Sequence, residues 1–302
     1  MRQLEITENE AEQRIDRFLL KYFNNTTRGN LYKLIRKKVF KVNGVRVKED
    51  YFLKRGDQLE IFLSDESIEA MIKPVRTVVP DALGLDIVYE DDALLVVNKP
   101  KGLLTHPDKT EYKNTLATRV QFYLKNLCTS TFKPSPVHRL DKNTSGIVLF
   151  AKTYEALKHY NELMRSREVE KYYQCVVHGV VKKPGEVVGY LIKDEAANKV
   201  KLIRHAEDSS KYCHTLYRPI RVFGGFTLME IKLITGRSHQ IRASMQWIDH
   251  PIVGDLKYGG RRVGSINSQL LHSGKLIIEG KTFEAPSKEI EAFMAENGSK
   301  TS

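Results

Sequence analysis

Strand-like runs dominate the chain between residues 86 and 285, and they follow one another at irregular intervals. A clear helical pattern interrupts them at Tyr154, Leu157, Tyr160 and Met164, but strands and helices do not alternate regularly. A sheet of repeated strand–helix units is therefore disfavoured, and the pattern predicts an α+β fold with a mixed, mainly antiparallel sheet. The runs read "DIVYEDDALLVVNKP", "GIVLFAK", "YYQCVVHGVV", "TLMEIKLI" and "KLIIEGKTFEA".

The first 64 residues have a different pattern, which predicts two short helices followed by a small sheet. Helical spacing relates Ile15, Phe18, Leu19 and Tyr22, and a second helix is expected after Thr27, a suitable N-cap. Further apolar positions of that helix are Leu31, Leu34 and Ile35. "KVNGVRVK" then alternates around an Asn-Gly pair, which is a strong signal for a two-residue hairpin.

These patterns divide the chain into four parts. We expect a small α+β domain over residues 1–64 and a linker without sustained periodicity over 65–84. The large β-rich domain should run over 85–288. Residues 289–302 are expected to form a polar, disordered tail.

Positive charge is concentrated in the first unit. The chain has a formal net charge of +12, and between Arg28 and Arg55 only Glu49 and Asp50 oppose the basic residues. A favourable helix C-terminus and a solvated face could explain a few of these charges. Contact with the phosphates of a nucleic acid explains the whole set better. The basic residues are Arg28, Lys33, Arg36, Lys37, Lys38, Lys41, Arg46, Lys48, Lys54 and Arg55.

Several classes of protein are disfavoured. The three cysteines are far apart and form no Cys-x-x-Cys pair, so neither a disulfide framework nor a metal site is expected. The N-terminus is polar and no apolar stretch approaches the length of a membrane span, so we expect a soluble, cytoplasmic protein. Phosphate-binding loops, dinucleotide fingerprints and the nucleophile elbow of serine hydrolases are absent from the sequence.

Three polar segments could carry chemistry. "HRLD" places Asp141 beside Arg139, "TGRSHQIR" crowds hydrogen-bonding side chains behind a glycine, and "EKYYQ" places two tyrosines on opposite faces of a strand. Each has a simpler reading: an Asx turn, a polar turn that opens a helix, and cross-strand packing. However, dense polar networks are unfavourable unless satisfied, and they often serve a site.

Two parts of the chain resemble known families. Residues 12–61, with "RIDRFL", "VNGVRV" and "GDQLEI", are similar to S4 RNA-binding modules. Residues 86–286 resemble RluA-type pseudouridine synthases, which isomerise uridine in RNA. That resemblance rests on "YEDDALLVVNKPKGLLTHP", "HRLDKNTSG", "KYYQCVVHG", "TGRSHQIR", "DHPIVGDLKYGG" and "QLLHSGKL", in this order.

The resemblance implies an isomerase with Asp141, Tyr173 and Arg242 as catalytic residues, Arg242 being paired with Asp141. It implies an extended central sheet with the cleft across it, and no cofactor or metal. An S4 module placed ahead of such a domain suggests modification of large-subunit (23S) ribosomal RNA. Ala243 and Ser244 depart from the usual pattern, which leaves the target open. Substrate-binding residues would be His138, Arg139, Arg237, His239, Gln240 and Leu271, and RNA-binding residues Arg28, Lys33, Arg36, Lys37, Lys38, Lys41, Arg46 and Lys48.

The residues also bear on the reaction. Asp141 must be ionised to act, and a dry pocket disfavours a carboxylate unless a cation lies near. Glycosidases use two carboxylates and admit water, whereas one carboxylate between apolar Leu140 and Ile147 favours isomerisation. Tyr173 would stack on the base or take a proton. A transfer-RNA target, a non-catalytic S4-type ribosome-assembly factor and a nucleoside hydrolase remain the alternatives. An oligomer is not implied.

Overall fold

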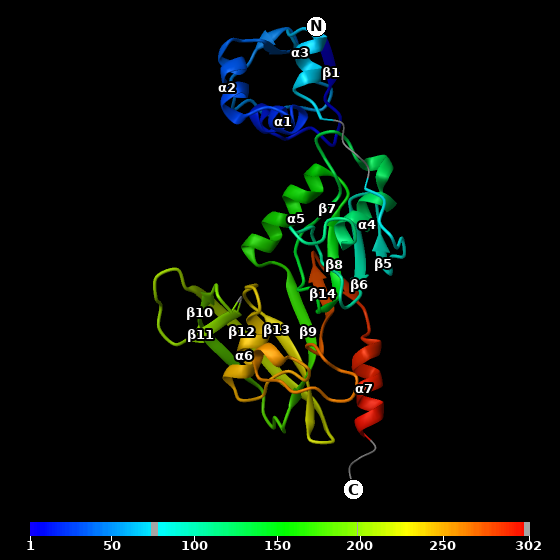
Figure 1. Ribbon diagram of the computed structural model, residues 1–302, viewed down its shortest axis with the longest axis vertical. Helices are drawn as coiled ribbons and strands as arrows, with labels where there is room; N and C mark the ends of the chain where they lie inside the picture. The colour runs from blue at the N-terminus through cyan, green and yellow to red at the C-terminus, as the bar shows by residue number, and fades with distance from the viewer. Residues whose placement is uncertain (74–77, 198, 299–302) are drawn as a thin grey trace.

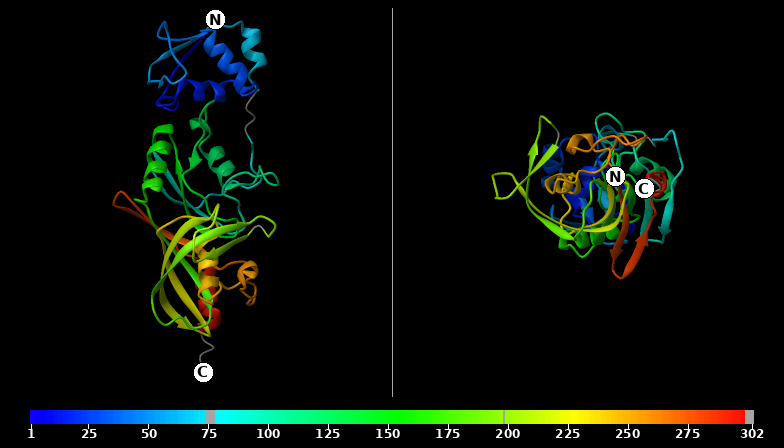
Figure 2. Two further views of the ribbon diagram at one scale, coloured as in Figure 1. Left: turned by 90° about the vertical axis from the view of Figure 1, so that its left-hand side faces the viewer. Right: turned by 90° about the horizontal axis from the view of Figure 1, so that it is seen from below.

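The computed structural model describes residues 1–73, 78–197 and 199–298 of the chain. The molecule is elongated, with the N-terminal unit at one end and helix α7 (Lys288–Gly298) towards the other (Figures 1 and 2). Within those ranges, no helix combines the length and the apolar character that crossing a membrane requires.

The N-terminal unit is a four-stranded antiparallel sheet, in the order β1-β4-β2-β3, that shares a core with three helices. This is the small α+β unit that the sequence predicted. The strands are β1 (Arg2–Glu5), β2 (Phe40–Val42), β3 (Val45–Arg46) and β4 (Gln58–Ile61), and the helices are α1 (Ile15–Tyr22), α2 (Arg28–Arg36) and α3 (Asp65–Ala70).

Local signals in this unit have the structural consequences expected of them. All four apolar positions of α1 are buried, and the side chain of Thr27 accepts a hydrogen bond from the backbone N–H of Asn30 at 3.2 Å. Asn43 and Gly44 turn the β2–β3 hairpin with φ of 50° and 76°, values that suit a type I′ turn.

The segment expected to be a linker begins with helix α3, which corrects that expectation for residues 65–70. Ser64 caps this helix by accepting a hydrogen bond from the backbone N–H of Ser67, and Ile68 is completely buried in the core of the N-terminal unit. A helix of six residues shows too little periodicity to be recognised in the sequence.

The second unit is built on an eleven-stranded sheet whose main path runs β11-β10-β12-β13-β9-β14-β8-β6-β5. β15 pairs with β14 and β7 pairs with β8. The α+β prediction is therefore confirmed. The strands are β5 (Ile87–Glu90), β6 (Leu94–Lys99), β7 (Ser135–Pro136), β8 (Ser145–Ala151), β9 (Glu170–His178), β10 (Gly185–Asp194), β11 (Lys199–Ile203), β12 (Lys211–Phe223), β13 (Phe226–Leu233), β14 (Leu271–Ile278) and β15 (Lys281–Glu284).

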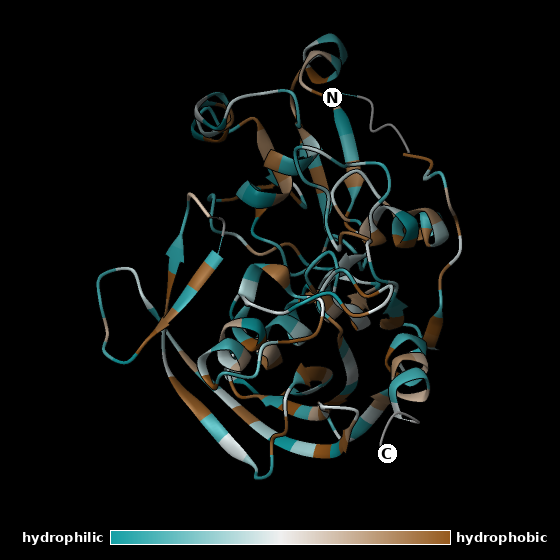
Figure 3. Ribbon diagram, turned by 60° about the horizontal axis from the view of Figure 1, so that its bottom comes forward, coloured by the Kyte–Doolittle hydropathy of each residue, from teal (hydrophilic) through white to brown (hydrophobic). Residues whose placement is uncertain are grey.

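Helices cover both faces of this sheet. β6 and β8 are buried on both sides, which explains why their sequences are continuously apolar: Val148 and Phe150 belong to one core, whereas Ile147 and Leu149 belong to the other. Figure 3 shows hydrophobic and hydrophilic residues alternating along other strands of the curved sheet. The helices are α4 (Leu116–Tyr123), α5 (Tyr154–Ser166), α6 (Gln240–Trp247) and α7, with short 3₁₀ turns at Lys125–Leu127 and Leu256–Tyr258.

One seam joins the two halves of the sheet. β8 and β14 pair in parallel there, whereas the other pairings among the described strands are antiparallel. Gly146 lies at this seam with φ of 115°, and a Cβ at this position would overlap the backbone of Ser273. The side chains of Ser145 and His272 form a hydrogen bond of 2.8 Å beside it. The seam therefore requires glycine, and it lies shortly after Asp141 in the chain.

The C-terminal segment expected to be disordered is helical as far as residue 298, so that expectation is wrong for residues 289–298. Ile290 and Phe293 of α7 are buried, and the ring of Phe293 packs against Phe226 with 5.2 Å between ring centroids. Glu289 forms an ion pair with Lys101 at 2.6 Å. These contacts come from distant segments, which the polar local sequence does not reveal. Residues 299–302 lie outside the described part of the chain.

The two units touch through a small polar contact. The hydroxyl of Thr131 donates a buried hydrogen bond of 3.1 Å to the carboxylate of Glu10, and the ammonium of Lys21 lies 5.0 Å from the centroid of the Tyr154 ring. The basic N-terminal unit is thereby held close to the end of the eleven-stranded sheet that carries α5 (Figure 1).

Candidate active site

The three polar segments meet at a small cavity of about 70 Å³ beside the sheet. Asp141 reaches it from the loop before β8, Tyr173 from β9 and Arg242 from α6. Arg139, Arg237, His239, Gln240 and Leu271 also line it, whereas His138 lines a neighbouring cavity of about 570 Å³. The structure thus brings together residues that are far apart in sequence, as expected.

The pairing of Arg242 differs in detail from the expectation. Its Nη1 lies 3.7 Å from Oδ2 of Asp141, which is an ion pair without a hydrogen bond. Both hydrogen bonds of its fork go to Asp255, at 2.7 Å each. Asp255 is 1% exposed and requires a cation, whereas the side chain of Asp141 is 27% exposed. Arg242 therefore lies between two carboxylates and is fixed by the buried one.

Electrostatics keep Arg242 charged. Burial by itself would lower its pKa, but the hydrogen bonds and charge of Asp255, together with the charge of Asp141, raise the pKa above its ordinary value. A permanently charged guanidinium therefore lies 3.7 Å from the carboxylate of Asp141.

Tyr258 packs against Arg242 and shares a hydrogen bond with His239. It is completely buried, its ring centroid lies 4.7 Å from the guanidinium carbon of Arg242, and burial raises its pKa to about 12. The Tyr258 hydroxyl accepts a hydrogen bond from the backbone N–H of Val200 in β11 and shares one with Nδ1 of His239, both at 2.9 Å. Tyr258 thus connects the β10–β11 hairpin to Arg242.

His239 completes the surroundings of Asp141. Its Nε2 lies 3.8 Å from Oδ2 of the carboxylate, and burial lowers the pKa of the imidazole despite the attraction of Asp141. Its backbone adopts the left-handed conformation, with φ of 54°, immediately before α6. This conformation is uncommon for a residue other than glycine. The His239 ring that follows from it lies beside the carboxylate of Asp141.

Tyr173 lines the cavity and its neighbour Tyr172 does not. Strand alternation predicted that the two tyrosines lie on opposite faces, and the family resemblance selected Tyr173. Tyr173 is 7% exposed, and burial raises its pKa to about 12, while a hydrogen bond with Ser273 opposes the rise. It is therefore a neutral phenol at physiological pH. Tyr172 instead bonds to Glu170 and lies against Lys232 and Lys275.

Gln240 does not present a free amide to a substrate, contrary to the sequence-based assignment. Its Oε1 accepts hydrogen bonds from the Thr235 hydroxyl at 2.8 Å and from the Arg237 backbone at 3.0 Å. Its Nε2 donates to the His214 carbonyl and the Thr215 hydroxyl, at 3.0 and 2.9 Å. The side chain is 1% exposed, so it fixes the turn that carries Arg237 and opens α6.

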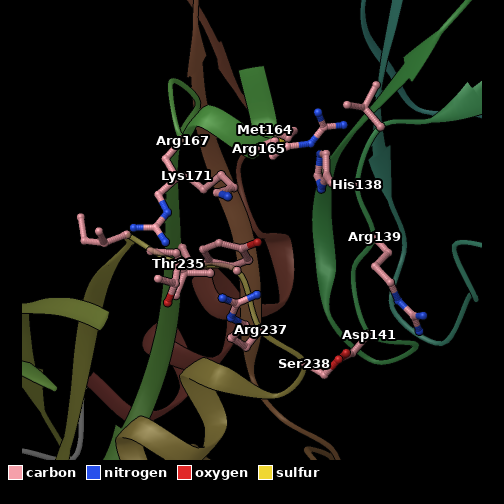
Figure 4. Close-up of a pocket in the computed structure, with 15 residues that line it drawn as sticks. His138, Arg139, Asp141, Met164, Arg165, Arg167, Lys171, Thr235, Arg237 and Ser238 are labelled. Carbon is pink, nitrogen blue, oxygen red and sulfur yellow. The ribbon is translucent and has the colours of Figure 1, made fainter. Parts of the chain in front are cut away.

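The side chains of His138 and Arg139 extend in different directions (Figure 4). The backbone N–H of Leu149 donates to Nε2 of His138 at 3.3 Å, and burial lowers the pKa of His138 to about 3, aided by the charge of Lys171. His138 is therefore neutral. Arg139 is exposed and lines the cavities on both sides of Asp141.

Lys99, which the sequence interpretation missed, fixes the loop that carries Asp141. It is completely buried, and its ammonium donates to the carbonyls of Pro100, Leu103 and Lys142 at 3.0, 2.7 and 3.0 Å. Burial lowers its pKa to about 7, although the negative charge of Asp141 opposes this shift. A lysine at the end of an apolar strand, directly before a proline, was the available signal.

Asp255 and Tyr258 were also missed as individual residues. Both belong to "GDLKYGG", a segment that the sequence singled out without assigning it a role. Their spacing carries no information about Arg242, because the contact depends on how the loop after α6 folds back beneath that helix.

The predicted RNA-binding residues of the N-terminal unit lie on α2, on the β2–β3 hairpin and in the short segments that follow them. Seven of the eight are exposed, and Lys41 is half-buried with its ammonium 4.9 Å from the centroid of the Phe62 ring. Within the part of the chain that the structure describes, none of the eight forms an ion pair. Their charge is available to a polyanion.

Comparison with known proteins agrees with this geometry. Residues 93–247 match the model of the RNA pseudouridylate synthase family, and residues 13–59 match the S4 domain. The chain is 33% identical to the uncharacterized RNA pseudouridine synthase YlyB of Bacillus subtilis, over 98% of both chains. It is 35% identical to the ribosomal large subunit pseudouridine synthase C of Vibrio cholerae (88% of this chain, 83% of the relative) and 32% identical to synthase D of Yersinia pestis (85% and 76%).

A solved structure shares the fold. Human RNA pseudouridylate synthase domain containing 4 superposes with a TM-score of 0.58 at 22% identity, covering 69% of this chain and 91% of the human one. Family matches over more than half of the sequence, full-length relatives and a converging acid, arginine and tyrosine point the same way. The chain belongs to the RluA-type RNA pseudouridine synthases, isomerases of RNA uridine that here carry an N-terminal S4 domain.

Proposed function

We propose that the chain converts specific uridines of large-subunit ribosomal RNA to pseudouridine, with Asp141 as its catalytic carboxylate. The observation that carries the chemistry is the meeting of Asp141, Tyr173 and Arg242 around one cavity. Relatives from Vibrio cholerae and Yersinia pestis that bear the ribosomal large subunit in their names support the substrate, as does the exposed basic face of the S4 domain. A ribosomal substrate implies a cytoplasmic protein.

The reaction breaks the bond between N1 of uracil and C1′ of ribose, turns the base, and forms a bond between C5 and C1′. The proton on C5 leaves and N1 ends protonated, so atoms and electrons balance within the substrate. The protein must supply a charged group at the sugar, a surface that holds the detached base, and shelter from water.

Asp141 supplies the charge. As an anion it either attacks the sugar or removes a proton from it while the base departs, and both routes require the same location. The guanidinium of Arg242 lies 3.7 Å away and forms an ion pair with Asp141 that is not a bidentate hydrogen bond. Because Asp255 fixes the guanidinium, Asp141 remains free to approach the substrate.

Tyr173 holds the base. Its ring borders the cavity beside Asp141, and stacking of an aromatic ring on a nucleobase contributes about 1–3 kcal/mol. A phenol with a pKa of about 12 stays neutral, so stacking and hydrogen bonding are the roles that its environment favours.

Arg139 assists extrusion of the uridine from its helix. It is exposed at the mouth of the site, where a long cationic side chain can occupy the space left by the base or hold its phosphate. Extrusion costs a few kcal/mol in folded RNA and less in an unpaired strand. Arg139→Ala should therefore slow conversion of folded RNA more than conversion of a short single strand; equal losses would refute this role.

The test of the function is incubation with ribosomal RNA that lacks pseudouridine, followed by mapping of pseudouridine at nucleotide resolution. A parallel incubation with unmodified transfer RNA distinguishes the two substrates, and Asp141→Asn is the control. New pseudouridine in large-subunit RNA that is absent with the variant supports the proposal.

Other outcomes of the same test would contradict it. Modification of transfer RNA alone would move the substrate, and release of free uracil would indicate hydrolysis. RNA binding without conversion of any RNA would indicate an assembly factor, and activity that survives in Asp141→Asn would refute the assignment of the carboxylate.

A further inference from the structure

A second, larger cavity adjoins the catalytic one, and most of its basic lining has no role in the reaction as described so far. Its volume is about 570 Å³, and it lies between the C-terminal end of α5, the start of β9 and the loop that follows β13 (Figure 4). Asp141 and Tyr173 also line it, so the two cavities share residues of the site where the uridine would react.

Positive charge dominates its lining away from Asp141. Arg165 and Arg167 come from the end of α5, Lys171 from β9 and Arg237 from the loop before α6. Of these four, only Arg165 pairs with a carboxylate among the described residues, that of Glu162 on the same helix. In Figure 4 the side chains of Arg167, Lys171 and Arg237 extend towards the same space.

Lys171 is a partly buried cation that no carboxylate among the described residues neutralises. It is only partly exposed and has no carboxylate partner within the described ranges, and a methyl group at Gly236 would lie 3.5 Å from its ammonium. Burial lowers its pKa, and the charge of Arg167 lowers it further. A partly buried cation beside another cation is unfavourable unless an anion completes the arrangement.

Stabilisation of the helix explains only part of this cluster. Arg165 and Arg167 lie where the negative end of the α5 dipole favours cations. Lys171 and Arg237 belong to other elements and gain nothing from that dipole. They converge on the helix end from a strand and a loop, which indicates a site rather than a helix terminus.

His138 also lines this wall, and it is neutral because burial lowers its pKa to about 3. Its Nε2 is occupied by the backbone N–H of Leu149. A neutral imidazole and several cations match an occupant with acceptor oxygens and a negative charge.

We propose that this cavity binds a phosphodiester of the RNA directly beside the target uridine, with Lys171 and Arg167 as its main contacts. The proposal rests on the proposed function, since it takes RNA as the occupant. It assigns to the cleft a phosphate site separate from the basic face of the S4 domain. The site would pull the backbone towards α5 and so present the ribose to Asp141.

The test measures binding, so that it remains informative whether or not a given RNA is converted. Full-length protein carrying Asp141→Asn is titrated with a short uridine-containing RNA at several salt concentrations. In this background Lys171→Met removes the charge, Lys171→Arg retains it, and Lys183→Met changes an exposed lysine in the β9–β10 loop as the matched control. Circular dichroism and thermal melting verify that each variant is folded.

A second part of the experiment identifies which phosphodiester of the RNA Lys171 contacts. Single phosphates on either side of the target uridine are replaced in turn by neutral methylphosphonates. If Lys171 contacts one of them, that replacement weakens binding to the Asp141→Asn protein but adds little when Lys171→Met is also present. Inorganic phosphate as a competitor distinguishes a site for any anion from one that requires the RNA chain.

We expect Lys171→Met to weaken binding about tenfold and to reduce the slope of log affinity against log salt by about 0.7–0.9, while Lys171→Arg and Lys183→Met remain near the parent. The proposal is overturned if Lys171→Met behaves like Lys183→Met, or if every methylphosphonate weakens both proteins equally. Normal binding by all variants in an enzyme that converts RNA would refute the phosphate site alone. Absence of conversion with an intact phosphate site would refute only the proposed function.

Discussion

The S4 domain and the catalytic cleft both concentrate positive charge, but they hold it in opposite ways. Arg36, Lys37 and Lys38 at the end of α2 are exposed, and in the described structure they form no ion pair. Arg242 in the cleft is 7% exposed, and Asp255 holds it in two hydrogen bonds. Solvated charges attract RNA through counterion release, whereas desolvated charges fix geometry. The comparison implies that affinity and chemistry can be altered separately.

The largest expected effect is on chemistry alone. Asp141→Asn should reduce the single-turnover rate by at least about 10⁴-fold, because it removes the only group proposed to act on the sugar. Affinity for RNA should change less than about threefold. Rapid-quench kinetics and filter binding measure the two quantities. A variant that loses affinity in proportion to rate would show that the two functions are not separable.

Asp255→Asn should lower the free energy of unfolding by about 3 kcal/mol, because the buried Arg242 loses the carboxylate that accepts both of its hydrogen bonds and keeps only the ion pair with the more exposed Asp141. Urea denaturation measures this loss. The matched control is Glu162→Gln, whose pair with Arg165 is exposed and should contribute less than about 1 kcal/mol. Equal stability of the two variants would contradict the distinction between buried and solvated pairs.

Lys99 tests the same distinction through pH. Its pKa is about 7 in the folded chain and near 10.5 in the unfolded chain, so between these values the unfolded chain binds the extra proton. Its contribution to stability therefore rises with pH in this window, by at most about 1.4 kcal/mol per unit. Lys99→Met should flatten the pH dependence of unfolding between pH 7 and 9 relative to the parent.

The exposed Lys142→Met is the control for this experiment, and its unfolding curve should run parallel to that of the parent. A Lys99→Met curve that is lower but equally steep would mean that Lys99 retains its proton throughout, held by its three carbonyl partners.

The smallest effect is expected for the S4 domain. Combined Arg36→Gln, Lys37→Gln and Lys38→Gln should weaken RNA binding about tenfold and reduce the salt slope by about two, without changing thermal stability. Conversion at saturating RNA should keep its rate. Fluorescence anisotropy at several salt concentrations measures the slope, and an unchanged slope would remove these residues from the RNA interface.

The sequence predicted features whose causes are local. Helix α1, the capped start of α2 and the Asn43-Gly44 turn depend on neighbouring residues, and each formed as expected. The convergence of Asp141, Tyr173 and Arg242 was predictable because their motifs resemble those of one family.

Features that depend on distant contacts were missed. Helix α7 is polar by composition and becomes ordered because Phe293 finds Phe226. Arg242 was expected to pair with Asp141. Its hydrogen bonds go instead to Asp255, because that carboxylate is more deeply buried and its charge is more costly to leave unpaired. Lys99 was given no role from the sequence, although it is completely buried. Burial decides all three outcomes, and no local pattern reports burial by a distant segment.

The missing side chain of Gly146 has a consequence for how the enzyme tolerates change. A single methyl group there would overlap the backbone of Ser273 and force β8 away from β14. The loop before β8 would then shift Asp141 relative to Arg242, which Asp255 holds on helix α6. Gly146→Ala is therefore expected to inactivate the enzyme by misaligning Asp141 and Arg242. Neither of these two side chains would itself be changed, and Gly146 makes no proposed contact with uridine.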